Sequence, residues 1–160
     1  MLVRPKLLAL TLALAPAGAF AQNTTAEFRS RFAQETDAMR RAQMMPRLGE
    51  AEFDEITKDT DAGKLPEALV VLKEYRDEIE SCEKGLDERN INAERHPKGY
   101  KQLEISLRQS LRRLNALLVS FTGDDQKPFL EVRADLDELN RHLIRELFPN
   151  QPDKEAAPPH

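Results

Sequence analysis

The fold is decided by residues 65–86, which read LPEALVVLKEYRDEIESCEKGL. The apolar side chains in this stretch recur at intervals of three and four residues, and this spacing keeps them on one face of an α-helix. Pro66 suits the first turn of such a helix, where its missing N–H would have no helical partner anyway. The pattern predicts a helix of about six turns that buries Leu65, Ala68, Leu72, Tyr75, Ile79, Cys82 and Leu86.

Two helices are predicted before this stretch. The first covers about residues 25–44 and the second residues 47–62. Pro46 disfavours helical geometry at Met45, so we expect the chain to kink or break between them. Gly63 fits the end of the second helix. The side chains expected to face inward are Phe28, Phe32, Met39 and Ala42 from the first helix, and Leu48, Phe53 and Ile56 from the second.

Two more helices are predicted after it, over about residues 100–121 and 127–148. Residues 89–99 form the longest internal connection and are rich in residues common in loops. Gly123 and the aspartates that follow it separate the last two helices, and Pro149 ends the second of them. The two apolar stripes are Tyr100, Leu103, Leu107, Leu111, Leu114, Leu118 and Phe121, and then Phe129, Val132, Leu136, Leu139, Leu143 and Leu147.

Five amphipathic helices joined by short connections predict an all-α fold, an antiparallel bundle spanning residues 22–149. The helices over residues 65–88, 100–121 and 127–148 are expected to form the core, with the first two packed across or beside them. The stripes hold almost no polar residue, so we expect no polar pocket inside the bundle. The proline-rich residues 150–160 are predicted to be a disordered tail.

Residues 1–21 are predicted to be a secretory signal peptide. Arg4 and Lys6 precede an apolar run from Leu7 to Ala15, and a small-residue exit ends at Ala21. This run is shorter than a membrane-spanning helix requires, so we expect cleavage and a periplasmic or secreted protein with no stable membrane insertion. The remaining chain has 22 basic against 28 acidic residues, a net charge of −6, which disfavours nucleic acid as a partner.

No motif for catalysis, for a cofactor or for a metal is found, and no site residue of these kinds is predicted. Cys82 occupies a position on the apolar stripe, although the sequence alone leaves open whether its thiol is buried or exposed. The residues Glu138, His142 and Glu146 would line one face of a helix, and that face avoids the apolar stripe. We therefore expect this row to point to solvent rather than to bind a metal.

Charge is divided unequally between two of the predicted helices. Residues 67–89 are rich in acids, whereas residues 98–113 carry five bases and only one acid, Glu104. We expect the two helices to lie antiparallel and to pair these charges along their flanks. The alternative is that Lys101, Arg108 and Arg112 form a basic face open to an anionic partner.

Residues 62–72, AGKLPEALVVL, resemble the turn between the two helices of a tetratricopeptide repeat. Gly63 would close the first helix, Ala68 would allow close helix contact, and Leu72 takes the place of the usual aromatic residue. The resemblance extends to Leu48-Gly49 and covers one hairpin, near residues 47–89. It implies binding of a protein or peptide in a groove, without catalysis. In its signal and in its lack of paired cysteines, the chain also resembles exported bacterial helical proteins.

These observations favour a non-enzymatic interaction protein, with another protein or a peptide as its partner. Two places are expected to bind it: a soft apolar patch around the first helix, made of Phe28, Phe32, Met39, Met44 and Met45, and the connection over residues 89–99. The alternatives are a metal-binding or enzymatic bundle and a self-associating structural protein. The number of subunits and the biological process stay open.

Overall fold

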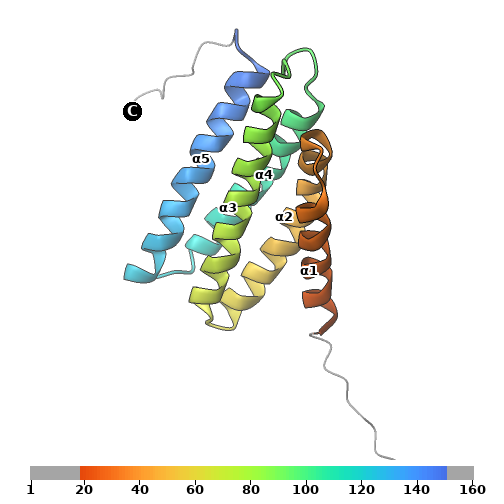
Figure 1. The fold of residues 1–160 in the computed structure, drawn as a ribbon. Helices are drawn as coiled ribbons and strands as arrows, with labels where there is room; N and C mark the ends of the chain where they lie inside the picture. Colours follow the sequence, from red (N-terminus) through yellow and green to blue (C-terminus); the bar gives the residue numbers. More distant parts are fainter. Residues whose placement is uncertain (1–18, 151–160) are drawn as a thin grey trace, which may run out of the picture.

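A computed structural model describes residues 19–150 of the chain, with side chains from Thr25 onward. All of its regular elements are helices, which confirms the predicted all-α bundle. Successive helices alternate in direction along the bundle, as Figure 1 shows. The helices are α1 (Ala19–Gln34), α2 (Ala38–Asp61), α3 (Leu65–Glu88), α4 (Lys98–Leu118) and α5 (Lys127–Leu147), and a short 3₁₀ turn, η1 (Gly123–Gln126), precedes α5.

The predicted apolar stripes form the core. The stripe of α3 is buried along nearly its full length, from Ala68 to Leu86, and Leu65 packs against its end. The stripes of α4 and α5 are buried in the same way, except that Phe121 and Leu139 are only partly covered. Two glycines between helices, Gly63 after α2 and Gly123 at the start of η1, have φ values of 71° and 58°, a region that residues with a side chain rarely adopt.

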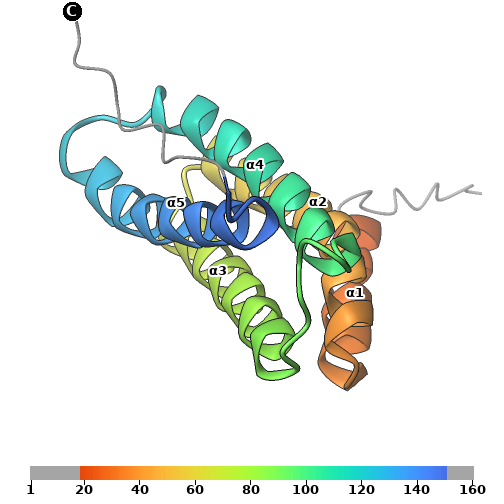
Figure 2. The same ribbon diagram turned by 90° about the horizontal axis from the view of Figure 1, so that it is seen from above.

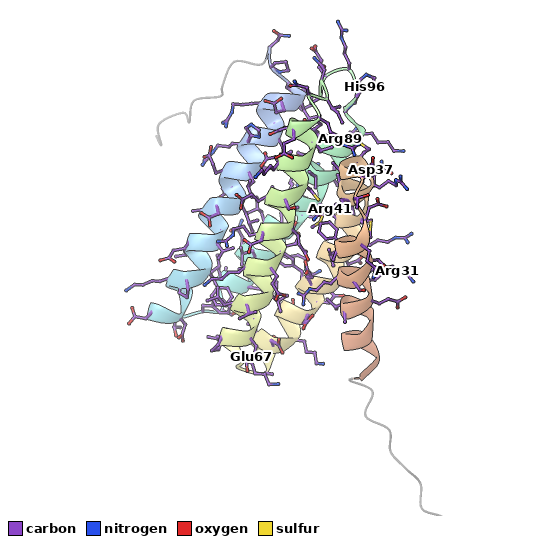
Figure 3. The ribbon with its side chains drawn as sticks, viewed as in Figure 1. Arg31, Asp37, Arg41, Glu67, Arg89 and His96 are labelled. Atoms are coloured by element: carbon purple, nitrogen blue, oxygen red, sulfur yellow. The ribbon has the colours of Figure 1, made fainter. Side chains whose placement is uncertain are left out.

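The break near the N-terminus was predicted at the wrong place. Pro46 lies inside α2, and the chain instead leaves the helix at residues 35–37. Asp37 begins α2, because its Oδ1 accepts a hydrogen bond from the Arg40 N–H at 2.9 Å. Its Oδ2 accepts another from Arg89 Nη1 at 2.7 Å, which ties this corner to the end of α3. Figure 3 labels Asp37 and Arg89 at this corner.

Tertiary packing explains why α2 continues through its proline. A proline inside a helix costs about 3 kcal/mol, whereas an N-cap contributes only about 1 kcal/mol. Local preferences would therefore favour a break at residue 45. However, the turns around Pro46 bury Ala42, Met45 and Gly49, and burial of such side chains offsets a local cost of this size.

The centre of the bundle also differs from the prediction. Helix α2 packs extensively on both α3 and α4, so it belongs to the core rather than beside it. Helix α5 covers the opposite side of α3 and α4, and α1 packs mainly on α2, as the view in Figure 2 shows. The close approach of α2 depends on Gly49, where an added Cβ would lie 2.8 Å from Tyr75 Cε2.

The predicted signal peptide falls almost entirely outside the described residues, although α1 begins at Ala19, within its last three positions. The predicted disordered tail also lies outside them, except for Asn150. No helix within residues 19–150 is long and apolar enough to cross a membrane.

Candidate functional site

A groove of about 720 Å³ lies at the end of the bundle where α4 begins and α5 ends. This is the upper end in Figure 1. One wall comes from the first turns of α4, the second from the connection over residues 89–97 and the third from the last residues of α5. It is lined by Ala93, Glu94, Pro97, Lys101, Glu104, Ile105, Arg108, Leu147, Phe148, Pro149 and Asn150.

The α5 wall presents an aromatic side chain to solvent. Helix α5 ends where the Phe148 N–H donates to the Ile144 carbonyl oxygen at 2.9 Å, and Pro149 cannot continue the helix. The Phe148 side chain is 52% exposed, and Ile144 one turn earlier is 36% exposed. Phenylalanine is enriched at protein interfaces relative to the rest of the surface.

The connection over residues 89–97 is held in place by specific contacts. The hydroxyl of Tyr100, a residue only 1% exposed, lies 3.0 Å from Asp87 Oδ1 and 3.3 Å from the Ile91 carbonyl oxygen. Asn92 Oδ1 accepts a hydrogen bond from the Arg95 N–H at 2.8 Å, and Ala93 is buried in the core. This wall is therefore pinned to α3 and α4, as a preformed groove requires.

The groove is lined by two basic and two acidic side chains, Lys101, Arg108, Glu94 and Glu104. Arg108 is paired with Glu104 at 3.3 Å. Among residues 25–150 neither Lys101 nor Glu94 belongs to an ion pair, so the Lys101 ammonium is available to an outside anion.

The predicted pairing of charges between α3 and α4 is wrong. The two helices run in opposite directions, as expected, but no ion pair joins them in the part of the chain that is described. The acids of α3 turn instead to its other neighbours: Glu74 to Arg29 of α1 at 2.9 Å, and Glu83 to His142 of α5. The reason is that α2 and α5, rather than α4, cover most of α3.

The basic residues of α4 do not form one continuous surface. Lys101 and Arg108 line the groove described above, whereas Arg112 lines a second depression with Pro46, Gly49 and Ser106. Arg113 turns to α2 and lies 2.7 Å from Asp54. Only the first part of the predicted stripe therefore borders the groove.

The predicted soft patch on the first helix is wrong, because its side chains belong to the core. Phe32 is 3% exposed and Met45 fully buried, while Phe28, Met39 and Met44 pack against the core cluster. The Arg41 guanidinium further covers the Phe32 ring at 4.4 Å. Of the two predicted binding places, residues 89–99 border the groove described above.

The expectation that the apolar stripes hold almost no polar residue missed a buried acid. Glu52 of α2 is fully buried, and its Oε1 accepts a hydrogen bond from Arg29 Nε at 2.8 Å. Burial and the nearby charge of Glu78 raise the pKa of Glu52 to about 9. The sequence held a signal for this. Residue 52 follows buried Met45 and Gly49 at helical spacing and precedes buried Ile56 by four residues, so it falls on the apolar stripe.

His142 does not simply face solvent as predicted. It is part-buried, and its Nδ1 lies 2.5 Å from Oε1 of Glu83, which is 7% exposed. Burial raises the pKa of Glu83, and the hydrogen bond from His142 opposes that rise. Glu146 lies 3.9 Å from Nε2, whereas Glu138 pairs with Arg141. The row is thus divided between a link from α5 to α3 and surface ion pairs.

Neither a metal cluster nor a reactive thiol is found among residues 25–150. No group of three or more histidine, cysteine or acidic side chains is arranged to hold a metal ion there. The Cys82 thiol is fully buried, which answers the question left open by its position on the stripe. Burial raises its pKa to about 12, so this thiol carries little of the thiolate that a nucleophile needs.

Comparisons with protein-family models, curated proteins and solved structures found no match to the chain.

Proposed function

We propose that this chain is an exported, non-enzymatic binding protein that holds an acidic, partly apolar peptide segment of a partner protein. The observation that carries the proposal is the groove in which exposed Phe148 lies across from unpaired Lys101. An apolar anchor next to a free positive charge fits a segment in which carboxylates alternate with leucine or phenylalanine.

The shape of the site supports binding rather than chemistry. The lining of the groove offers no histidine, cysteine or hydroxyl side chain, and its one arginine already has a carboxylate partner. Of the two carboxylates that could act as an acid or base there, Glu104 is already paired with Arg108, at 3.3 Å. The preformed walls instead favour binding at a low entropic cost. The tetratricopeptide-like hairpin does not support this proposal, because its turn lies at the start of α3 and the groove lies near the end of α3.

Binding is tested with a fluorescein-labelled peptide of repeated Asp-Glu-Leu triplets, followed by fluorescence anisotropy. We expect Phe148→Ala to weaken binding about tenfold, because it removes the aromatic anchor. Lys101→Glu should weaken it about fivefold or more at low salt and less at high salt, since exposed charges are screened. Val119→Ala and Lys73→Glu are matched controls, because both positions are exposed and lie outside the groove.

Two results would overturn the proposal. One is equal binding of a peptide with lysine in place of every acid, which would mean that the rim charge selects nothing. The other is a dimer by light scattering that Phe148→Ala converts to monomer, since the groove would then hold a second copy of the chain.

Export is tested by the N-terminus of the protein recovered from the cell envelope. We expect the first residue to be Gln22, because cleavage after Ala21 fits the small-residue pattern. Arg29 and Phe32, which attach α1 to the bundle, lie beyond this point and would be kept. Mass spectrometry of the purified protein measures the end directly, and a protein that retains Met1 and stays in the cytoplasm would contradict the proposed location.

A further inference from the structure

We propose that Glu52 and Glu78 form a buried proton-binding site that links the surrounding pH to the attachment of α1. The two carboxyl groups come from α2 and α3, which pack against each other, and each shifts the pKa of the other. The Oε2 atoms of both are buried, and no donor among the described residues reaches them. Two carboxylate oxygens can only accept hydrogen bonds, so a stable contact between these groups requires a shared proton.

The arginines around the pair are too few to balance the nearby acids without that proton. Arg29 of α1 lies 2.8 Å from Glu52 and 2.9 Å from Glu74. Arg41 of α2 is the second cation that acts on Glu78. Arg29 and Arg41 face Glu52, Glu74 and Glu78, and Glu55 adds a fourth negative charge near Arg29. A proton on the Glu52–Glu78 pair reduces this negative excess, which is favourable because an uncompensated buried charge is costly.

The other titratable groups near the pair do not replace the proton. Tyr75 and Cys82 of α3 are fully buried, and burial raises the pKa of each to about 12, so both stay neutral below that pH. Glu55 of α2 adds negative charge near Arg29. On α4, Ser106 and Ser110 act on the Tyr75 hydroxyl and carry no charge. Loss of the proton therefore leaves an excess of negative charge between the helices.

Arg29 couples the protonation of the Glu52–Glu78 pair to the attachment of α1. This arginine is the residue of α1 that forms ion pairs with both α2 and α3 in the described structure. When the pair is protonated, Glu52 Oε1 still accepts the Arg29 hydrogen bond. When it is deprotonated, repulsion between two buried carboxylates opposes the close packing of α2 and α3 at the point where α1 is attached.

The sign of the pH dependence follows from linkage. The pKa of Glu52 is about 9 in the folded chain, against an ordinary value of 4.5 in the unfolded chain. Between these values the folded chain holds a proton that the unfolded chain has released, so stability falls as the pH rises. The contribution is complete below pH 4.5 and is lost by the time the pH passes about 9. One proton changes the unfolding equilibrium constant by up to about tenfold per pH unit.

The experiment is urea unfolding of the full chain between pH 5.5 and 9, followed by circular dichroism. Glu52→Gln supplies an uncharged side chain whose amide can donate to Glu78, so it imitates the protonated acid. For each protein, the unfolding equilibrium constant at pH 8.5 is divided by its value at pH 5.5. We expect this ratio to be at least about tenfold lower for E52Q than for the wild type. Glu50→Gln is the matched control, because Glu50 is exposed on the same helix.

Two further measurements separate the shared proton from a merely structural role. Glu78→Gln should reduce the pH slope as Glu52→Gln does, and the double variant should add little, because a single proton is lost in each case. Hydrogen exchange, corrected for intrinsic rates, should show α1 losing protection with rising pH more steeply than α5.

The proposal fails if Glu52→Gln keeps the wild-type pH slope. It also fails if carbon-13 NMR of the wild-type protein shows both carboxyl groups titrating in the ordinary acidic range. This NMR titration decides the matter even if a variant does not fold.

Discussion

Replacement of Phe53 by alanine is expected to lower the free energy of unfolding by about 3–5 kcal/mol. Phe53 is fully buried in α2, and its ring meets the Tyr75 ring edge-on with centroids 5.2 Å apart. The Arg113 guanidinium lies 5.5 Å from the same ring on the side of α4. The substitution therefore leaves a cavity where α2, α3 and α4 meet, and these rigid neighbours cannot fill it.

The measurement for Phe53→Ala is denaturant unfolding at a fixed pH, compared with Val119→Ala. Val119 is 86% exposed, so its truncation should change stability by less than about 0.5 kcal/mol. A loss below about 1 kcal/mol for Phe53→Ala would show that α2 is not part of the core, contrary to the packing described above.

Replacement of Gly49 by alanine should cost about 1–3 kcal/mol, although alanine is the better helix former by about 1 kcal/mol. The added Cβ would lie 2.8 Å from Tyr75 Cε2 and 3.4 Å from Ser106 Oγ. The Tyr75 ring cannot move aside, because it is fully buried against Phe53. The helices α2 and α3 must therefore separate slightly.

Gly99→Ala is the matched control for this prediction. A Cβ at residue 99 would approach Met39 Sδ at 2.7 Å and Leu86 Cδ2 at 3.1 Å. Both atoms lie near the ends of flexible side chains that can rotate away. We expect the thermal midpoint of Gly49→Ala to fall by several degrees more than that of Gly99→Ala. Equal effects would indicate that close contact at Gly49 is unimportant.

The sequence predicted only part of the groove. The groove is formed by segments that are polar and loop-like, and part of it was predicted because residues 89–99 are long and rich in loop formers. Phe148 was expected as the last residue of a helix, but its exposure beside that loop depends on where α5 ends relative to α4. Residues separated by about 50 positions meet there, and no local pattern predicts such a meeting.

The apolar periodicity alone was sufficient to predict the helices, the burial of the α3 stripe and the all-α bundle, because a helix that buries one face must repeat apolar residues every three or four positions. The glycines themselves indicated the connections at Gly63 and Gly123, since chain reversals need backbone angles that glycine tolerates. Only tertiary packing could carry α2 through Pro46 and place it at the centre of the bundle. The same packing brought Arg29 against buried Glu52 and turned the acids of α3 away from the bases of α4. These outcomes depend on which helix faces cover one another, and that is settled by the summed burial of the whole core rather than by any local preference.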